Sequence, residues 1–92
     1  MASPASLDQW LKRLAANVKR TRQRQGLTQE ELAANARIAP RYLQEIERAR
    51  TNPSLAMIIR VADALGVDPR SLLRATPLLG SARPGRPRRR DS

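Results

Sequence analysis

The sequence predicts an all-α domain of five short helices, followed by a basic tail. Three observations support this prediction. Apolar residues recur in several segments at the three- and four-residue spacing of a helix. No segment alternates apolar and polar residues for long enough to predict a strand. Ser, Thr, Asp and Pro stand where helices should begin, and Gly stands where two of them should end.

The first helix is predicted to begin after Ser6 and to end at Gly26. Ser6 can cap it, and Gln9 stands three residues later, at the reciprocal position of a capping box. Gly26 is typical of the residue just past a helix C-terminus. Residues 1–5 precede the cap, and we expect them to be disordered. One face of the helix is expected to be apolar, with Leu7, Trp10, Leu11, Leu14 and Val18.

The second and third helices are expected at about residues 28–36 and 40–48. Thr28 can cap the second, with Glu31 completing a capping box. Pro40 can begin the third, because a helix makes no use of the N–H of its first residue. A residue between them must turn the chain sharply. The residues expected to face inward are Leu32, Ala33, Ala36, Leu43 and Ile46.

The fourth helix is expected between Ser54, its cap, and Gly66. Its inward face should hold Leu55, Ile58, Val61, Ala62 and Leu65. Asp68 and Pro69 then cap and begin a short fifth helix. The folded domain would thus span residues 6–75. Residues 76–92 are rich in Pro and Arg, so we expect a flexible basic tail.

Composition points to a polyanionic partner. The 92 residues carry a net charge of +10, of which the tail from Gly80 supplies +4 and the rest of the chain +6. We see no secretory signal and no apolar run of the roughly 20 residues that a membrane span needs. We therefore expect a cytoplasmic protein that does not enter membranes.

The same composition argues against an enzyme. The chain has no His and no Cys, which removes the usual general base and the commonest metal ligands. Neighbouring carboxylates, such as Glu45 and Glu47, diverge on a helix instead of converging. We find no nucleophile with a base and no glycine-rich phosphate loop. We expect no catalysis, no metal, no cofactor and no small-molecule effector site in this chain.

The order of several motifs is more specific. GLTQEELA, followed by RYLQEIERARTNPSL and ADALGVDPRSLL, resembles the Cro/phage-repressor-like helix-turn-helix family, the Xre group. The resemblance runs from about Leu14 to Leu73. It implies a sequence-specific, DNA-binding transcriptional regulator of bacteria or phages. In that family the helix near Thr28 lies across the phosphate backbone, and the helix near Pro40 enters the major groove.

The resemblance places the base contacts on helix 40–48. With Leu43 and Ile46 buried, the outward residues are Pro40, Arg41, Gln44 and Glu45. Arg41 can donate two hydrogen bonds to guanine, and Gln44 can pair with adenine in the same bidentate way. Pro40 can meet a thymine methyl group. Glu45 can accept from cytosine, or it can reject a misplaced phosphate.

The backbone contacts implied by the resemblance lie around that helix. They are Thr28, Gln29, Tyr42, Arg48, Arg50, Thr51 and Asn52. Tyr42 has an alternative role, since its ring can pack against the second helix, and Thr51 can be an ordinary surface residue. Arg22 and Glu47 match a partly buried salt bridge between the first and third helices of phage repressors.

This chain departs from the family pattern around helix 40–48. Arg37 stands in the tight turn where Gly is usual, and Ala49 stands where Gly often ends the helix. Ala39 cannot supply the side-chain cap that a Ser, Thr or Asp would give, a loss of about 1 kcal/mol. We expect the fold to survive these changes at reduced stability.

We expect a homodimer that binds a palindromic operator and represses by occluding a promoter. Candidate dimer residues are Leu72, Leu73, Leu78 and Leu79, which can alternatively close the base of the core. The tail is similar to an AT-hook, with Arg86, Arg88 and Arg89 as possible minor-groove residues, or else it adds non-specific charge. The alternative function is a protein-interaction module, of the coactivator-bridging or antitoxin type, that binds DNA weakly.

Overall fold

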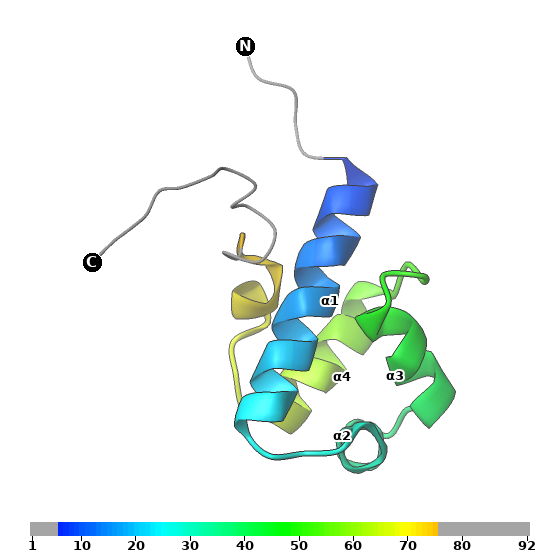
Figure 1. Cartoon of the computed structure of the whole chain (residues 1–92), viewed down its shortest axis with the longest axis vertical. Coiled ribbons are helices and arrows are strands. Elements are labelled where there is room, and N and C mark those ends of the chain that lie inside the picture. Colours follow the sequence, from blue (N-terminus) through cyan, green and yellow to red (C-terminus); the bar gives the residue numbers. More distant parts are fainter. Residues whose placement is uncertain (1–5, 76–92) are drawn as a thin grey trace, which may run out of the picture.

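The computed structural model describes residues 6–75, and within them it contains α-helices and one 3₁₀ helix but no strand (Figure 1). The elements are α1 (Leu7–Arg24), α2 (Gln29–Ala36), α3 (Pro40–Glu47), α4 (Leu55–Leu65) and the 3₁₀ helix η1 (Pro69–Leu73). The all-α prediction is confirmed, and each predicted helix range is met within two residues at either end.

Three helices begin with the caps that the sequence predicts. The Ser6 hydroxyl accepts from the backbone N–H of Gln9, and Thr28 does the same for Glu31 at 3.0 Å. In both cases the later side chain accepts from the backbone N–H of the cap, which completes a capping box. The Ser54 hydroxyl accepts from the N–H of Met57. These hydrogen bonds satisfy donors that no turn of the helix itself could satisfy.

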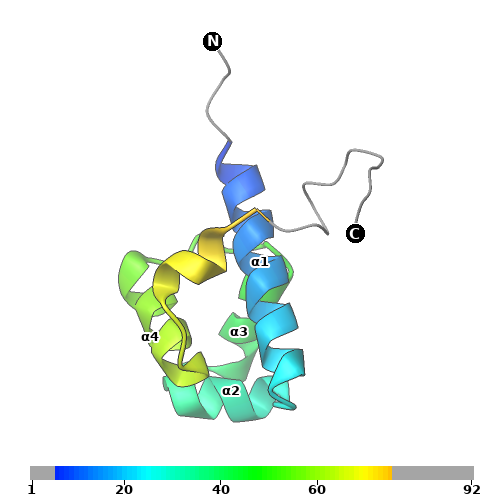
Figure 2. The same ribbon diagram turned by 90° about the vertical axis from the view of Figure 1, so that its left-hand side faces the viewer.

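The core lies where α1, α3, α4 and η1 converge above α2. Figure 2 shows α1 and α4 on opposite sides of the domain, with α2 across the base. The contacts pair α1 with η1 and α3, and pair α2 with α4 and α3. The core side chains are aliphatic: Leu14, Val18, Leu32, Ala33, Ala36, Leu43, Ile46, Val61, Ala62, Leu65 and Leu72. Helix period thus sets which face each helix buries.

The fifth element differs from the prediction. It is a 3₁₀ helix of five residues, Pro69–Leu73, and not an α-helix. The segment is too short to form the several i to i+4 bonds that favour an α-helix, and short pieces of this kind commonly tighten into 3₁₀ turns. Leu72, a candidate dimer residue, is fully buried here. Leu72 therefore closes the core, as the alternative held, and cannot offer dimer surface.

Three residues expected on apolar inner faces are exposed. Leu7 is 57% exposed and Trp10 is 40% exposed, because the first turns of α1 extend beyond the core. The guanidinium of Arg13 lies 4.6 Å from the centroid of the Trp10 ring and partly covers it. Leu55 is the first residue of α4 and is 67% exposed.

The backbone is left-handed at two non-glycine residues on either side of α3. Arg37, between α2 and α3, has φ 60° and ψ 45°, and Ala49, just after α3, has φ 57°. These are the two positions where the family pattern has Gly. A side chain in this conformation costs roughly 1–2 kcal/mol. The third helix is therefore held between two strained residues.

Candidate nucleic-acid interface

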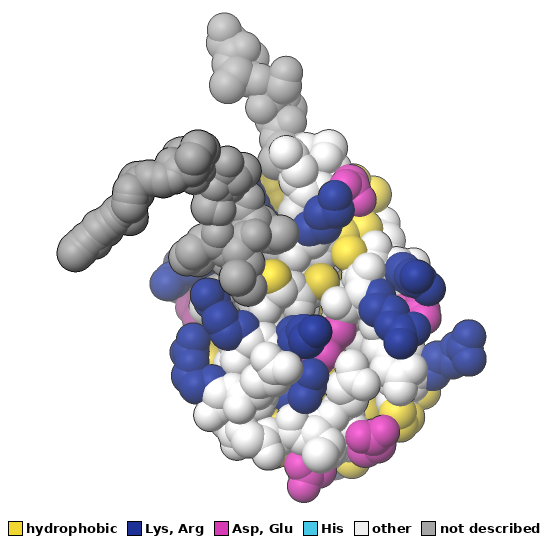
Figure 3. Space-filling view, in the orientation of Figure 1, with side chains coloured by type: hydrophobic (Ala, Val, Ile, Leu, Met, Phe, Trp, Pro, Cys, Tyr) yellow, Lys and Arg dark blue, Asp and Glu magenta, His cyan; other side chains and the backbone are white. Residues whose placement is uncertain are grey.

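Helix α3 presents one face to the core and the other to solvent. Leu43 and Ile46 are buried, at 0% and 2% exposure, and they fix how the helix is turned. Arg41 is exposed, whereas Gln44 and Glu45 are half-buried. Dark blue Lys and Arg side chains lie on the right of Figure 3, the side on which α3 lies in Figure 1, and others lie in the centre and on the left of the same face. The helix thus offers long polar side chains on a face of the molecule that carries many basic groups.

The N-terminus of α3 is open. Ala39 has the extended conformation of a cap but makes no side-chain hydrogen bond, and Pro40 is the first helical residue. Both are exposed. The start of the helix therefore carries a small apolar surface with nothing built over it in the described part of the chain.

Tyr42 is half-buried and packs against the core. The sequence left open packing against the second helix beside a contact with DNA, and the ring packs against a core to which α2 contributes together with the other helices. The ring lies on α3 one residue after Arg41 and one before the fully buried Leu43. Its main environment is thus the protein interior, and only its exposed part could reach a ligand.

The loop after α3 carries most of the other predicted backbone contacts. Arg48, Arg50 and Asn52 are exposed, and Thr51 is half-buried. The backbone N–H of Arg50 donates to the carbonyl of Glu45 at 2.9 Å, which ties the loop back onto the helix. The loop is thereby held beside α3, with two guanidinium groups free to reach a nearby anion.

Arg22 and Glu47 form a bidentate ion pair between α1 and the end of α3. Arg22 Nε donates to Glu47 Oε2 at 2.7 Å, and Arg22 Nη2 donates to Oε1 at 3.0 Å. The two side chains are only 11% and 3% exposed. The hydrogen bond with Glu47 raises the pKa of Arg22, and the carboxylate charge acts in the same direction, while burial opposes it. Arg22 therefore keeps its positive charge at any ordinary pH.

Both residues of the pair make further hydrogen bonds, one to the α1–α2 connection and one to the start of α2. Arg22 Nη1 donates to the carbonyl of Leu27 at 2.9 Å. The side chain of Gln29, the first residue of α2, donates from Nε2 to Glu47 Oε1 at 3.0 Å. Gln29 and Glu47 were predicted to have separate roles, and the structure brings them together. No sequence pattern signalled this contact, since it depends on how α2 packs against α3.

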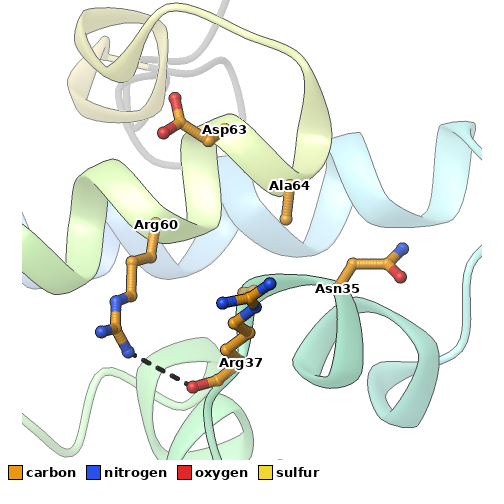
Figure 4. A pocket seen from close by; sticks show the side chains of 6 residues that line it. Asn35, Arg37, Arg60, Asp63 and Ala64 are labelled. Atoms are coloured by element: carbon orange, nitrogen blue, oxygen red, sulfur yellow. Dashed lines mark hydrogen bonds between the residues drawn. The ribbon is translucent and has the colours of Figure 1, made fainter.

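A shallow hollow of about 300 Å³ opens on another side, between the end of α2 and α4. Its lining residues are Asn35, Ala36, Arg37, Arg60, Asp63 and Ala64 (Figure 4). Arg60 Nη1 donates to the carbonyl of Arg37 at 3.3 Å, which steadies the left-handed turn before α3. The hollow mixes two guanidinium groups with one carboxylate and has no buried polar group aimed into it. Its lining residue Arg60 supports the turn through this hydrogen bond.

One buried polar residue escaped the sequence analysis. Asn17 on α1 is 3% exposed, and its Nδ2 donates to the carbonyls of Leu72 and Arg74 at 3.0 and 2.9 Å. Asn17 therefore holds η1 against α1. Its place inside the first helix, between Leu14 and Val18, was the available signal, because a polar residue on a buried face needs partners.

Several of the predicted residues lie outside the part of the chain that the structure describes. Arg86, Arg88 and Arg89 of the tail, and Leu78 and Leu79, fall outside residues 6–75. Within 6–75, acidic side chains form no group of three that could hold a metal ion. In the same range, none of the helices has the length and apolar character to cross a bilayer.

Comparison with known proteins adds the relationship that the geometry suggests. The helix-turn-helix family model HTH_3 matches residues 18–72, which include α2, α3 and the turn between them. An uncharacterised HTH-type transcriptional regulator of Sinorhizobium fredii is 41% identical over 56 residues, covering 61% of this chain and 73% of that protein. An immunity repressor protein of Bacillus phage phi105 is 46% identical over 50 residues, which are 54% of this chain and 35% of the repressor.

Solved structures agree. The restriction-modification controller protein of Aeromonas hydrophila superimposes with a TM-score of 0.66 at 34% identity, covering 67% of this chain and 94% of that one. The clp gene regulator of Corynebacterium glutamicum gives the same TM-score at 33% identity, with 76% and 87% covered. The two solved structures thus share the fold of this domain.

Proposed function

Because this chain belongs to the HTH_3 helix-turn-helix family and is a DNA-binding transcriptional regulator, we propose that α3 reads a palindromic operator in the major groove. The observation that supports this most directly is the orientation of α3. Leu43 and Ile46 anchor one face in the core, so Arg41 must point outward from the first turn of the helix. A major groove about 12 Å wide admits a helix presented in this way.

The proposed base contacts come from four residues on the outer face of α3. Arg41 donates to guanine and Gln44 pairs with adenine, while Pro40 meets a thymine methyl group and Glu45 accepts from cytosine. Arg41 is exposed and can extend into the groove, whereas Gln44 and Glu45 are half-buried. Arg41 is therefore the residue we expect to set sequence preference most strongly.

The proposed phosphate contacts lie on two sides of α3. Thr28 and Gln29 lie at the start of α2, where free backbone N–H groups also favour an anion. Tyr42 and the loop residues Arg48, Arg50, Thr51 and Asn52 lie on or just after α3. Contacts on both sides would fix the depth and register of α3 without reading sequence.

We propose that the protein acts in the cytoplasm as a homodimer and represses by covering a promoter. One α3 helix reaches only a few base pairs, and two copies on a palindrome about one helical turn apart would double the contacts. The phage repressor relative is in keeping with repression. Arg86, Arg88 and Arg89 of the tail would add positive charge near the DNA, by entering the minor groove or by non-specific attraction.

Selection from a random duplex library at physiological salt tests this function. The full-length chain should enrich a palindrome, and Arg41→Ala should weaken the preference at one base pair in each half-site. Arg70→Ala is the matched control, because it removes the same charge from η1, on the side of the domain away from α3 (Figure 1). Enrichment of A·T-rich DNA alone, unchanged by Arg41→Ala, would contradict the proposal and favour an interaction module.

A further inference from the structure

We infer that Glu47 is a positioning residue for DNA binding, because it holds the side chain of Gln29 ready for a phosphate. The inference rests on the proposed function, in which Gln29 contacts the DNA backbone. Gln29 Nε2 donates to Glu47 Oε1 at 3.0 Å and joins the first residue of α2 to the last residue of α3. The bond therefore links the phosphate contact to the helix that reads the bases.

Glu47 is a rigid anchor for this purpose. Its side chain is 3% exposed, and its two oxygens accept three hydrogen bonds, two from Arg22 and one from Gln29. Arg22 is itself tied to the carbonyl of Leu27, two residues before Gln29. Arg22 is thus fixed by a further contact, and its two hydrogen bonds hold the carboxylate in place beside Gln29.

The geometry leaves part of the Gln29 amide free. A carboxamide nitrogen carries two hydrogens, and Glu47 takes one of them. Gln29 is half-buried, so the second N–H is on a side chain that still reaches the surface. A phosphate oxygen accepts hydrogen bonds and offers none, so it can take this second N–H while Glu47 keeps the first.

Holding Gln29 in place lowers the entropy lost on binding. A free glutamine side chain loses the freedom of three torsions when it is fixed by a ligand. Here the loss has already occurred when the protein folds, so less of it opposes DNA binding. The same bond fixes the distance from the phosphate contact to α3, and hence the register of the base contacts.

A double-mutant cycle on the full-length chain tests the inference. The background is Arg22→Met/Glu47→Leu, which removes the acceptor of Gln29 and leaves net charge unchanged. Replacing a buried ion pair by apolar residues of similar size commonly preserves folding. Gln29→Ala is then measured in the wild-type chain and in this background, with a short duplex of mixed sequence and with the duplex that the wild type selects.

We expect Gln29→Ala to weaken binding roughly tenfold in the wild type and roughly twofold in the background variant. The same factor in both would overturn the positioning role and leave the phosphate contact intact. No loss in either would remove Gln29 from the interface, which contradicts both the inference and that part of the proposed function. If the wild type still selects a palindrome while Gln29→Ala causes no loss of binding, the proposed function stands and only the role of Gln29 fails.

A second measurement applies if the background variant does not fold. In the wild-type chain without DNA, the side-chain amide protons of Gln29 should exchange with water several-fold more slowly than those of Gln23, which is exposed on α1. Addition of the mixed-sequence duplex should then slow the second Gln29 proton as well. Equal exchange of Gln29 and Gln23 in the free protein would overturn the inference.

Discussion

Arg22 on α1 and Glu47 at the end of α3 pair through two hydrogen bonds, of 2.7 and 3.0 Å, across 25 residues of sequence. The pair fixes α3 to α1, the longest helix of the domain. Together with Gln29 and the carbonyl of Leu27, it joins three elements at one carboxylate. The stability of the fold and the orientation of α3 therefore depend on the same hydrogen bonds.

Glu47→Gln should destabilise the protein strongly. It leaves the Arg22 guanidinium, 11% exposed, without a counter-charge, and removal of one partner of a buried pair costs about 3–5 kcal/mol when burial is complete. Thermal unfolding followed by circular dichroism should show a large fall in Tm. Arg22→Met/Glu47→Leu should recover most of it, because neither charge then remains buried. A Glu47→Gln variant that melts with the wild type would contradict this.

Arg37→Gly should stabilise the domain by about 1 kcal/mol. Arg37 has φ 60°, a conformation that Gly adopts without the clash of a Cβ atom. Part of the gain is lost because Gly makes the unfolded chain more flexible. Its backbone carbonyl still accepts from Arg60 in the variant. Urea unfolding measures the change, and Arg37→Ala, which keeps the strain, should give no such gain.

Asn17→Leu should destabilise the fold although it adds apolar surface to a buried site. The carbonyls of Leu72 and Arg74 would each lose the donor that now lies 3.0 and 2.9 Å away. An unsatisfied buried polar group costs about 1–3 kcal/mol. Amide hydrogen exchange should quicken in residues 69–75 before it quickens in α2. Uniform exchange across the domain would mean that Asn17 does not hold η1 in particular.

Asp68 should titrate at low pH. The side-chain hydrogen bond from Arg70, and then the bond from the Arg70 backbone N–H, lower the pKa of Asp68 from 3.8 to about 2. Since the folded pKa is the lower one, Asp68 favours the folded state above pH 3.8, and this contribution is lost as pH falls towards 2. The effect on stability should be slight, because the group is exposed to solvent.

The direct check is a carboxyl chemical-shift titration. Arg70→Ala should return the pKa of Asp68 most of the way towards 3.8, since the side-chain bond is the larger cause. Asp8 is the internal reference, because it lies on α1 and pairs with Lys12, not with Arg70. A pKa of Asp68 near 3.8 in the wild type would show that the pair does not persist in solution.

The local parts of this fold could be predicted from the sequence. Ser6, Thr28 and Ser54 cap helices through bonds to residues three positions away, so the pattern that predicts them contains both partners. The buried faces of α2 and α3 follow from helix period alone. Arg22 and Glu47 could be paired only through the family resemblance, because nothing within either helix identifies the other.

Packing between elements decided the rest. Leu55 was predicted to face inward, and Leu72 to offer dimer surface or to close the core. In the structure Leu72 is fully buried and Leu55 is 67% exposed. Asn17 meets Leu72 and Gln29 meets Glu47 only because separate helices come to lie side by side. Helix formation depends on neighbours within one turn, which a sequence displays. The burial of a side chain, and the partner of a polar group, depend on which segment distant in sequence packs against it. Only the tertiary structure decides that.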